Sequence, residues 1–206
     1  MTAAPAELIA FLAPGLVHQF GNVLFTVQGH GATLEPATLA RAQVAIANAC
    51  ERGGAGLRLF RLLLGEPGAW YAEAGATAAM VGELLRIPVR EAGHTFELEV
   101  APGELGRVEV GAFVAFAAGA VQALVAVVPQ GVAGTVRLGV ARDGGAVRAE
   151  VTFRRAAADL PFPLPVGETV AKVTALLARL GHATAVRARP DGLRAAWPAA
   201  TGVVEA

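Results

Sequence analysis

Apolar residues recur at helical spacing through the first third of the chain and predict two consecutive helices. The first is predicted to begin near Ala6 and the second to cover residues 38–64. A break between the two helices is predicted at Pro36, because proline suits the first turn of a helix and restricts the residue before it. The pattern therefore predicts an antiparallel helical hairpin. The apolar positions of its first helix are Leu8, Leu12, Leu16, Phe20, Val23 and Val27.

The pattern changes after a break at residues 65–68, where helices and alternating strands follow one another. A helix is predicted over 110–128, and its apolar character is typical of a helix buried on most sides. We expect an α+β fold, with a helical-hairpin domain over 1–67 and a layered α/β sandwich over 68–206. The remaining predicted elements are helices at 73–86 and 166–180 and strands at 94–100, 135–141, 146–153, 183–189 and 193–197.

The first helix has an unusually wide apolar face. At about 100° per residue, its apolar positions spread from roughly 40° to 180° around the axis, counted from Leu8. The arc includes Val17 and Leu24, and it is wider than the stripe of a typical surface helix. One neighbouring helix would not cover it, whereas the second helix of the hairpin and another copy of the hairpin would. The sequence therefore predicts a homodimer built on a four-helix bundle.

His18 and Asn22 lie on the opposite flank of that helix, near 280° and 320° on the same wheel. The imidazole of His18 is therefore predicted to face solvent, with Asn22 one turn along the same face. Phe11 and Phe25, each seven residues from His18, are predicted to lie beside it and to form an apolar docking surface for another protein. His30 falls inside the apolar arc instead.

Composition narrows the possible partners. The chain is 54% hydrophobic and 17% charged, which is enough to bury a sizeable core. Its 17 basic residues equal its 17 acidic ones, and Lys172 is the only lysine. Because phosphate backbones and acidic lipids attract proteins with an excess of basic residues, we expect neither nucleic acid nor a membrane surface as a partner.

Cysteine usage and hydropathy bear on the compartment. Cys50 is the only cysteine, so an intrachain disulfide and a Cys-rich zinc site are excluded, and a reducing, cytoplasmic location is expected. Two stretches, Leu8–Leu34 and Val110–Val136, run 27 residues each without a formal charge. Polar residues and prolines interrupt both stretches, so neither is predicted to span a membrane.

Several other candidates receive a structural interpretation. Gly53, Gly54 and Gly56 lie within a helical pattern, with no preceding strand and no Gly-Lys-Ser/Thr sequence, so a closely packed helix is favoured over a phosphate loop. His94 and His182 have no cysteine or carboxylate at ligand spacing, and no metal site is predicted. Serine-based nucleophilic catalysis is excluded, since the chain contains no serine.

The segment from His18 to Leu24 resembles the phosphotransfer motif of two-component sensor histidine kinases. In that family the acceptor histidine opens a motif that continues with an acidic residue, an apolar residue and, further on, often an Asn and a Leu. Here the motif reads His-Gln-Phe-Gly-Asn-Val-Leu. The predicted order of elements is also similar to that of the kinases over nearly the whole chain, from a dimerisation hairpin to an ATPase-like catalytic domain.

The sequence departs from these kinases at the nucleotide site. The family holds magnesium and ATP phosphates with an Asn on the helix matching 110–128, where this chain has Gly119, Ala120 or Gln122. The adenine-binding Asp-x-Gly-x-Gly motif is absent after Phe153, and Gly167 stands alone where a glycine-rich loop is expected. Without these groups phosphoryl transfer from ATP loses positioning and charge neutralisation, which implies a degenerate ATPase-like domain.

A histidine hairpin beside a degenerate ATPase-like domain is similar to the dimeric histidine phosphotransferases of phosphorelays. The resemblance implies that His18 accepts and passes on a phosphoryl group, that response-regulator receiver domains are the partners, and that magnesium is supplied by the receiver. No cofactor is expected on this chain. Gln19 replaces the usual acidic neighbour, and it can orient the imidazole but cannot accept its proton. Asn22 is predicted to hydrogen-bond near the imidazole or to meet the partner.

The sequence also allows two alternative functions. The first is a non-catalytic dimeric adaptor that binds a receiver domain or a histidine kinase, which the replacement at Gln19 favours. The second is a genuine kinase with an unusual nucleotide site. The sequence favours a phosphorelay intermediate over an autokinase.

Overall fold

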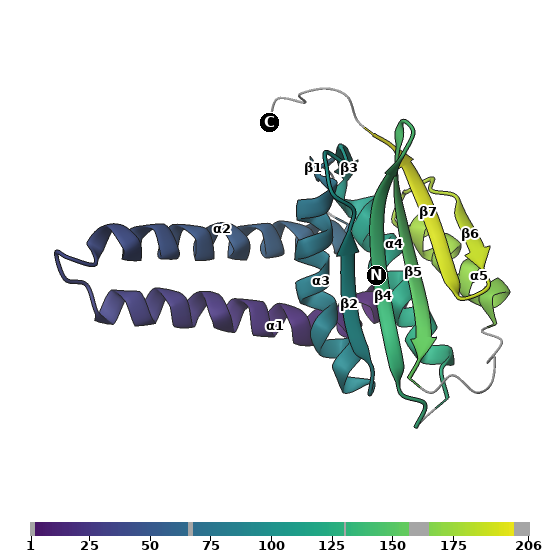
Figure 1. The fold of residues 1–206 in the computed structure, drawn as a ribbon, viewed down its shortest axis with the longest axis horizontal. Coiled ribbons are helices and arrows are strands. Elements are labelled where there is room, and N and C mark those ends of the chain that lie inside the picture. Colours follow the sequence, from purple (N-terminus) through teal and green to yellow (C-terminus); the bar gives the residue numbers. More distant parts are fainter. Residues whose placement is uncertain (1–2, 66–67, 130, 157–164, 200–206) are drawn as a thin grey trace.

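Two long helices form an antiparallel hairpin that projects from one side of the molecule (Figure 1). The computed structural model describes residues 3–65, 68–129, 131–156 and 165–199. Helix α1 covers Ala3–Ala32 and helix α2 covers Leu39–Leu63, so the chain turns where Pro36 predicts a break. The helical hairpin is confirmed.

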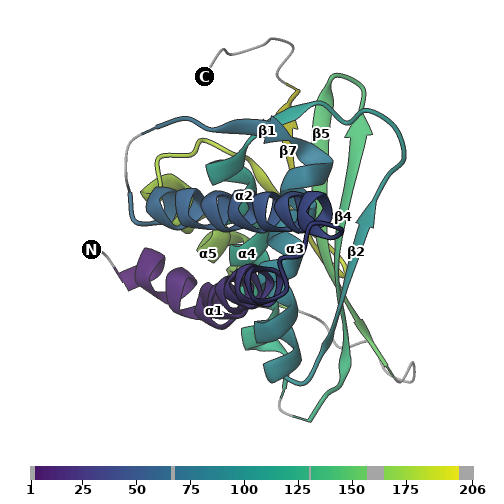
Figure 2. The same cartoon turned by 90° about the vertical axis from the view of Figure 1, so that its left-hand side faces the viewer.

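The rest of the chain is an α/β sandwich, and the predicted α+β fold class is confirmed. Its main sheet has the strand order β2–β4–β5–β7–β6, with β2 parallel to β4 and the other neighbours antiparallel. Three helices cover one face of this sheet (Figure 2). The bounds are α3 Ala74–Glu91, α4 Val110–Val127, α5 Val166–Arg179, β2 Thr95–Val100, β4 Gly134–Asp143, β5 Ala146–Arg155, β6 Val186–Arg189 and β7 Gly192–Pro198.

Local chemistry explains several of these boundaries. Glu73 caps α3, since its carboxylate accepts a hydrogen bond from the Ala76 amide at 2.6 Å. Helix α3 continues past the predicted end at residue 86 and includes Pro88. Pro88 and Val89 are both buried, and this packing offsets the cost of a proline inside a helix. The strands predicted at 135–141 and 146–153 are present as β4 and β5, and a tight turn with Gly144 at φ 60° joins them.

Two short strands escaped the sequence analysis. Strand β1 (Tyr71–Glu73) pairs antiparallel with β3 (Arg107–Glu109) in a separate two-stranded sheet. Strands of three residues are too short to display an alternating pattern, so periodicity does not reveal them. Together they bring the start of α3 next to the start of α4.

The hydrophobic core is centred on α4, as its composition predicts. Phe113 and Phe116 are fully buried and contact the Trp197 ring, with ring centroids 5.4 and 5.6 Å away. Each such aromatic pair adds about 0.5–1.5 kcal/mol beyond burial. Leu8 and Leu12, from the first turns of α1, are also fully buried in this core cluster. The base of the hairpin therefore packs into the sandwich.

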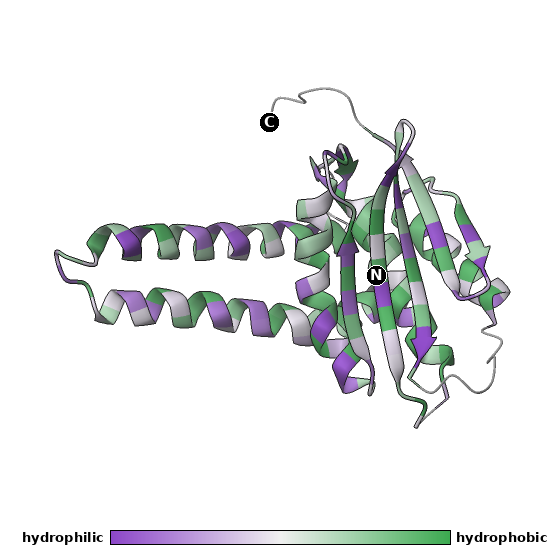
Figure 3. Cartoon of the chain, viewed as in Figure 1, coloured by the Kyte–Doolittle hydropathy of each residue, from purple (hydrophilic) through white to green (hydrophobic). Residues whose placement is uncertain are grey.

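The two helices α1 and α4 are long and apolar enough, by length and composition alone, to cross a membrane, within the described ranges. In α4, 72% of the apolar window is buried inside the fold, which its role as core helix explains. In α1 only 22% of the window is buried, and Val17, Leu24 and Phe25 are exposed. Figure 3 shows hydrophobic residues along both helices of the hairpin. The exposed apolar part of α1 is therefore a candidate surface for contact with another protein chain.

Candidate functional site

His18 is exposed on α1, as the helical wheel predicts. It lies three residues after Gly15, where α1 crosses α3 so closely that a Cβ added at Gly15 would overlap the Leu84 carbonyl. This backbone contact fixes the position of α1, and hence of His18, relative to α3. Within the described ranges, no hydrogen bond or ion pair engages the imidazole, so both ring nitrogens are available to a partner.

A hollow of about 520 Å³ lies beside His18, between α1, the second half of α3 and the start of β2. It brings together a histidine of the hairpin with charged side chains of the sandwich that are far away in the sequence. Sequence reasoning missed this grouping, because no local pattern relates α1 to α3. The lining residues are His18, Glu83, Arg86, Ile87, Arg90, His94, Thr95 and Phe96.

The two arginines of this hollow are differently engaged. Arg86 lies 3.8 Å from the Glu83 carboxylate, and both side chains are 62% exposed, so the pair contributes little. Arg90 is exposed and has no hydrogen-bond or ion-pair partner in the part of the chain that the structure describes. A free guanidinium therefore stands in the same hollow as the candidate acceptor histidine.

His94 is one of the residues that line the hollow. Its ring packs edge-on against Phe153, with centroids 5.3 Å apart, and its Nδ1 atom has no hydrogen-bond partner within the described ranges. Desolvation by burial lowers the pKa of His94 below its usual 6.5. The His94 imidazole is consequently neutral at neutral pH.

Gln19 points across the hairpin. Its Nε2 atom donates a hydrogen bond to the Arg52 carbonyl of α2 at 3.4 Å. Gly56 leaves the room for this side chain, since a Cβ there would lie 2.9 Å from the Gln19 Oε1 atom. The hydrogen bond that we expected toward the His18 imidazole is thus not formed in this state, and the amide joins α1 to α2 instead.

Asn22 is exposed one turn further along α1, and its side chain makes no hydrogen bond to the described residues. The expected aromatic surround of His18 needs a correction. Phe25 is 75% exposed, as predicted, but Phe11 is half-buried and packs against the core. The helical wheel places Phe11 on the surface because it takes no account of the sandwich that covers the first turns of α1.

The groove between α4 and α5, where the resemblance places a nucleotide, is partly occupied by the chain itself. Gln122 donates a hydrogen bond to the Glu7 carbonyl of α1 at 3.2 Å. A Cβ added at Gly119 would lie 2.6 Å from Leu176 Cδ2, so that side chain fills the space beside the glycine. A volume of about 330 Å³ remains. Residues 157–164, with Asp159, lie outside the described residues.

Comparisons with known proteins find likeness in architecture only. No protein-family model matches the sequence, and no curated protein matches it. The catalytic domain of histidine kinase ThkA is 13% identical at a TM-score of 0.46, over 65% of this chain and 98% of that domain. A bacterial phosphotransferase is 15% identical at a TM-score of 0.36, over 95% of this chain and 97% of its own.

A third solved structure spans both parts of the chain. The histidine kinase AdeS of Acinetobacter baumannii is 12% identical at a TM-score of 0.42, over 87% of this chain and 95% of its own. The common features are the helical hairpin and the α/β sandwich that the structure itself shows. At these identities and TM-scores, the likeness assigns no activity.

Proposed function

We propose that the chain is a phosphorelay histidine phosphotransferase, in which His18 exchanges a phosphoryl group with response-regulator receiver domains without using ATP. The observation that carries the proposal is an exposed, unengaged imidazole on a helix that Gly15 holds against α3. Gln122 and Leu176 meanwhile engage the groove where a kinase would hold its nucleotide. Residues 1–67 then act as the phosphotransfer domain and 68–206 as the degenerate ATPase-like domain.

The chemistry requires little of this chain. A neutral imidazole is nucleophilic near pH 7, because its ordinary pKa is about 6.5. The lone pair of one ring nitrogen of His18 forms a bond to the phosphorus of an aspartyl phosphate on the receiver. The bond from phosphorus to the aspartate oxygen breaks, and its electron pair leaves on the carboxylate. Any magnesium ion needed for this step would be supplied by the receiver rather than by this chain.

The proposed homodimer would cover the exposed apolar surface of α1. Val17 and Leu24, seven residues apart on one face of the helix, are 71% and 68% exposed in the single chain. Burying such a side chain fully stabilises an assembly by about 1.5–3 kcal/mol. A second hairpin packed on this face completes the four-helix bundle and leaves His18 on another flank.

A cytoplasmic location stays a prediction. It rests on the single cysteine, Cys50, which is exposed on α2.

The test compares two histidines of the same helix. Incubation with a phosphorylated receiver domain is expected to transfer an acid-labile phosphoryl group to the protein. His18→Ala is expected to abolish the labelling. His30, which is half-buried on the same helix, provides the control, and His30→Ala is expected to retain the labelling. Labelling of His18→Ala at the rate of the unmodified protein would contradict the assignment.

The adaptor alternative retains one specific observation in its favour. Gln19 is held by α2, so no side chain next to His18 in the sequence assists proton movement at the imidazole. An adaptor would bind a receiver domain with unchanged affinity after His18→Ala and would never carry an acid-labile phosphoryl group. The two functions therefore differ in a direct measurement of label against binding.

A further inference from the structure

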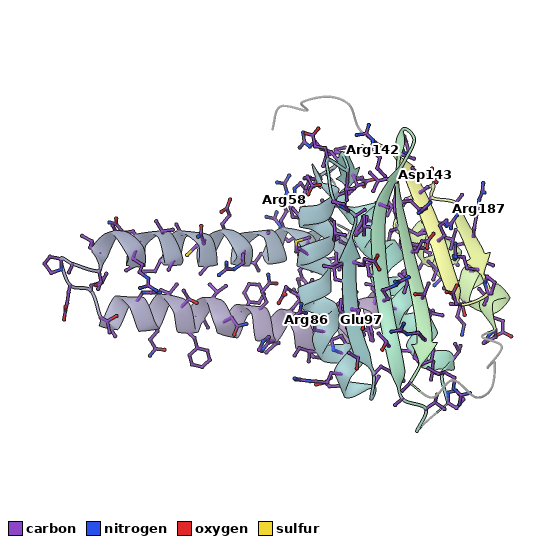
Figure 4. The ribbon with its side chains drawn as sticks, in the orientation of Figure 1. Arg58, Arg86, Glu97, Arg142, Asp143 and Arg187 are labelled. Carbon is purple, nitrogen blue, oxygen red and sulfur yellow. The ribbon has the colours of Figure 1, made fainter. Side chains whose placement is uncertain are left out.

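We propose that Arg86 and Arg90 of α3 bind the phosphoryl group that His18 carries. The proposal rests on the proposed function and goes beyond it, because it assigns a role in the phosphotransfer to the second domain. The observation behind it is that the two arginines and the His18 imidazole line one hollow of about 520 Å³. Figure 4 shows Arg86 where α3 passes the hairpin.

The relative position of these groups is fixed by backbone packing. Arg86 and Arg90 are four residues apart and therefore share one face of α3. Gly15 touches the Leu84 carbonyl, three residues before His18 on one helix and two before Arg86 on the other. Figure 2, which looks along the hairpin, shows α1 running against α3. The reach of an arginine side chain across the hollow is thus set by a rigid helix crossing.

The charges that face the hollow favour an anion. Arg86 and Arg90 are cations, and Glu83 is the one carboxylate of the lining. Glu83 lies 3.8 Å from Arg86 and leaves Arg90 unpaired among the described residues. His94 contributes no charge near neutral pH, because burial lowers its pKa. The hollow therefore carries a net positive charge beside the atom that would be phosphorylated.

A guanidinium suits a phosphoryl group for geometric reasons. Its planar donors match phosphate oxygens, and hydrogen bonds between two charged groups are shorter and stronger than neutral ones. Arg86 and Arg90 would neutralise the phosphoryl oxygens as the N–P bond to His18 forms and the bond to the receiver aspartate breaks. After the receiver leaves, the same two guanidinium groups would still neutralise the phosphohistidine.

The experiment measures three quantities on the full chain for Arg86→Gln, Arg90→Gln and the double variant. They are the single-turnover rate of labelling at saturating phosphorylated receiver, the half-life of the phosphohistidine after the receiver is removed, and the pKa of the phosphoryl group by phosphorus NMR. For the third, His18 is phosphorylated with phosphoramidate, without any receiver. Arg41→Gln, an exposed arginine of α2 that does not line the hollow, is the matched control.

We expect each single variant to lose about 10- to 100-fold in the saturating rate, the effect of one hydrogen bond to a charged group. The half-life is expected to shorten and the phosphoryl pKa to rise, while Arg41→Gln changes none of the three. Unchanged values in both single variants and in the double variant would overturn the proposal. A higher receiver concentration at half-saturation with an unchanged saturating rate would also overturn it, since the arginines would then only attract the receiver.

The phosphoramidate arm separates this proposal from the proposed function. If no receiver labels the unmodified protein, the phosphorelay role fails. The phosphoryl pKa of chemically phosphorylated His18 still tests the arginines in that case: a rise in Arg90→Gln supports the contact, and no change refutes it. Because Arg86 and Arg90 are exposed, the variants are expected to fold as the unmodified protein does.

Discussion

At the level of single residues, the candidate site is defined by side chains that have no internal hydrogen-bond or ion-pair partner. His18 and Arg90 are exposed and have no partner within the described ranges. Gln19, by contrast, is anchored on the Arg52 carbonyl. Since the imidazole has no internal partner, docking of the proposed receiver would set its orientation. The Gln19 amide meanwhile fixes the register of the two helices beneath it.

His94 makes the stability of the molecule depend on pH. Burial lowers its pKa below 6.5, so the unfolded chain binds the proton more readily than the folded one. Its contribution is therefore present above pH 6.5 and is lost as the pH falls below that value. We expect the melting temperature to fall between pH 7.5 and pH 5.5, and His94→Phe, which keeps a ring against Phe153, to lessen that fall.

Thermal denaturation at both pH values checks this prediction. His30→Phe serves as the control, because His30 lies toward the tip of the hairpin on α1. An equal pH dependence in the unmodified protein and in His94→Phe would show that the buried ring does not titrate in this range.

At the scale of elements, the crossing of α1 over α3 decides how the histidine is presented. Gly15→Ala would force a Cβ into the Leu84 carbonyl, and the two helices would have to separate. We expect a loss of about 1–3 kcal/mol in the free energy of unfolding, together with slower labelling of His18. Chemical denaturation and the labelling assay measure the two effects.

Gly21→Ala is the matched control for this crossing. Gly21 belongs to the same helix, and a Cβ there would meet nothing within 4 Å. Alanine is a better helix former, so a gain of about 0.5–1 kcal/mol is expected. A loss of stability in Gly21→Ala as large as that in Gly15→Ala would show that the close approach to α3 is not the cause.

The groove between α4 and α5 gives the second prediction at this scale. Leu176 fills the space beside Gly119, and Gln122 is bonded to the first turns of α1. We expect an ATP analogue at micromolar concentration to cause no shift in melting temperature and no heat of binding. Saturable binding in calorimetry would revive the alternative of a kinase with an unusual nucleotide site.

At the scale of the whole molecule, the proposed dimer separates two faces of α1. Leu24→Glu is expected to convert the dimer to a monomer, because it would bury a charge against a second hairpin. Phe25→Glu is expected to leave the dimer intact and to weaken receiver binding, because it removes an exposed aromatic side chain from the proposed docking surface. Sedimentation measures the first effect and receiver titration the second. If sedimentation gave the same dimer mass for Leu24→Glu as for the unmodified protein, the four-helix bundle would be contradicted.

The sequence predicts the large elements better than their contacts. The hairpin and the buried helix α4 are long periodic segments, so tertiary packing hardly alters them. The predicted end of α3 at residue 86 is too early, because the packing of the buried Pro88 offsets the cost of a proline inside the helix. The prediction for Phe11 fails because the sandwich that covers the first turns of α1 has no local sequence signature. For the same reason, the arginines of α3 could not be grouped with a histidine of α1 before the fold was known.

The proposed exchange of a phosphoryl group at His18 is tested most directly by incubating the unmodified protein with a phosphorylated receiver domain. Any acid-labile phosphoryl group is then mapped by peptide sequencing under alkaline conditions. We predict a single labelled residue, His18, and return of the label to an unphosphorylated receiver. Absence of label in a complex that does form, or label on another residue, would contradict it.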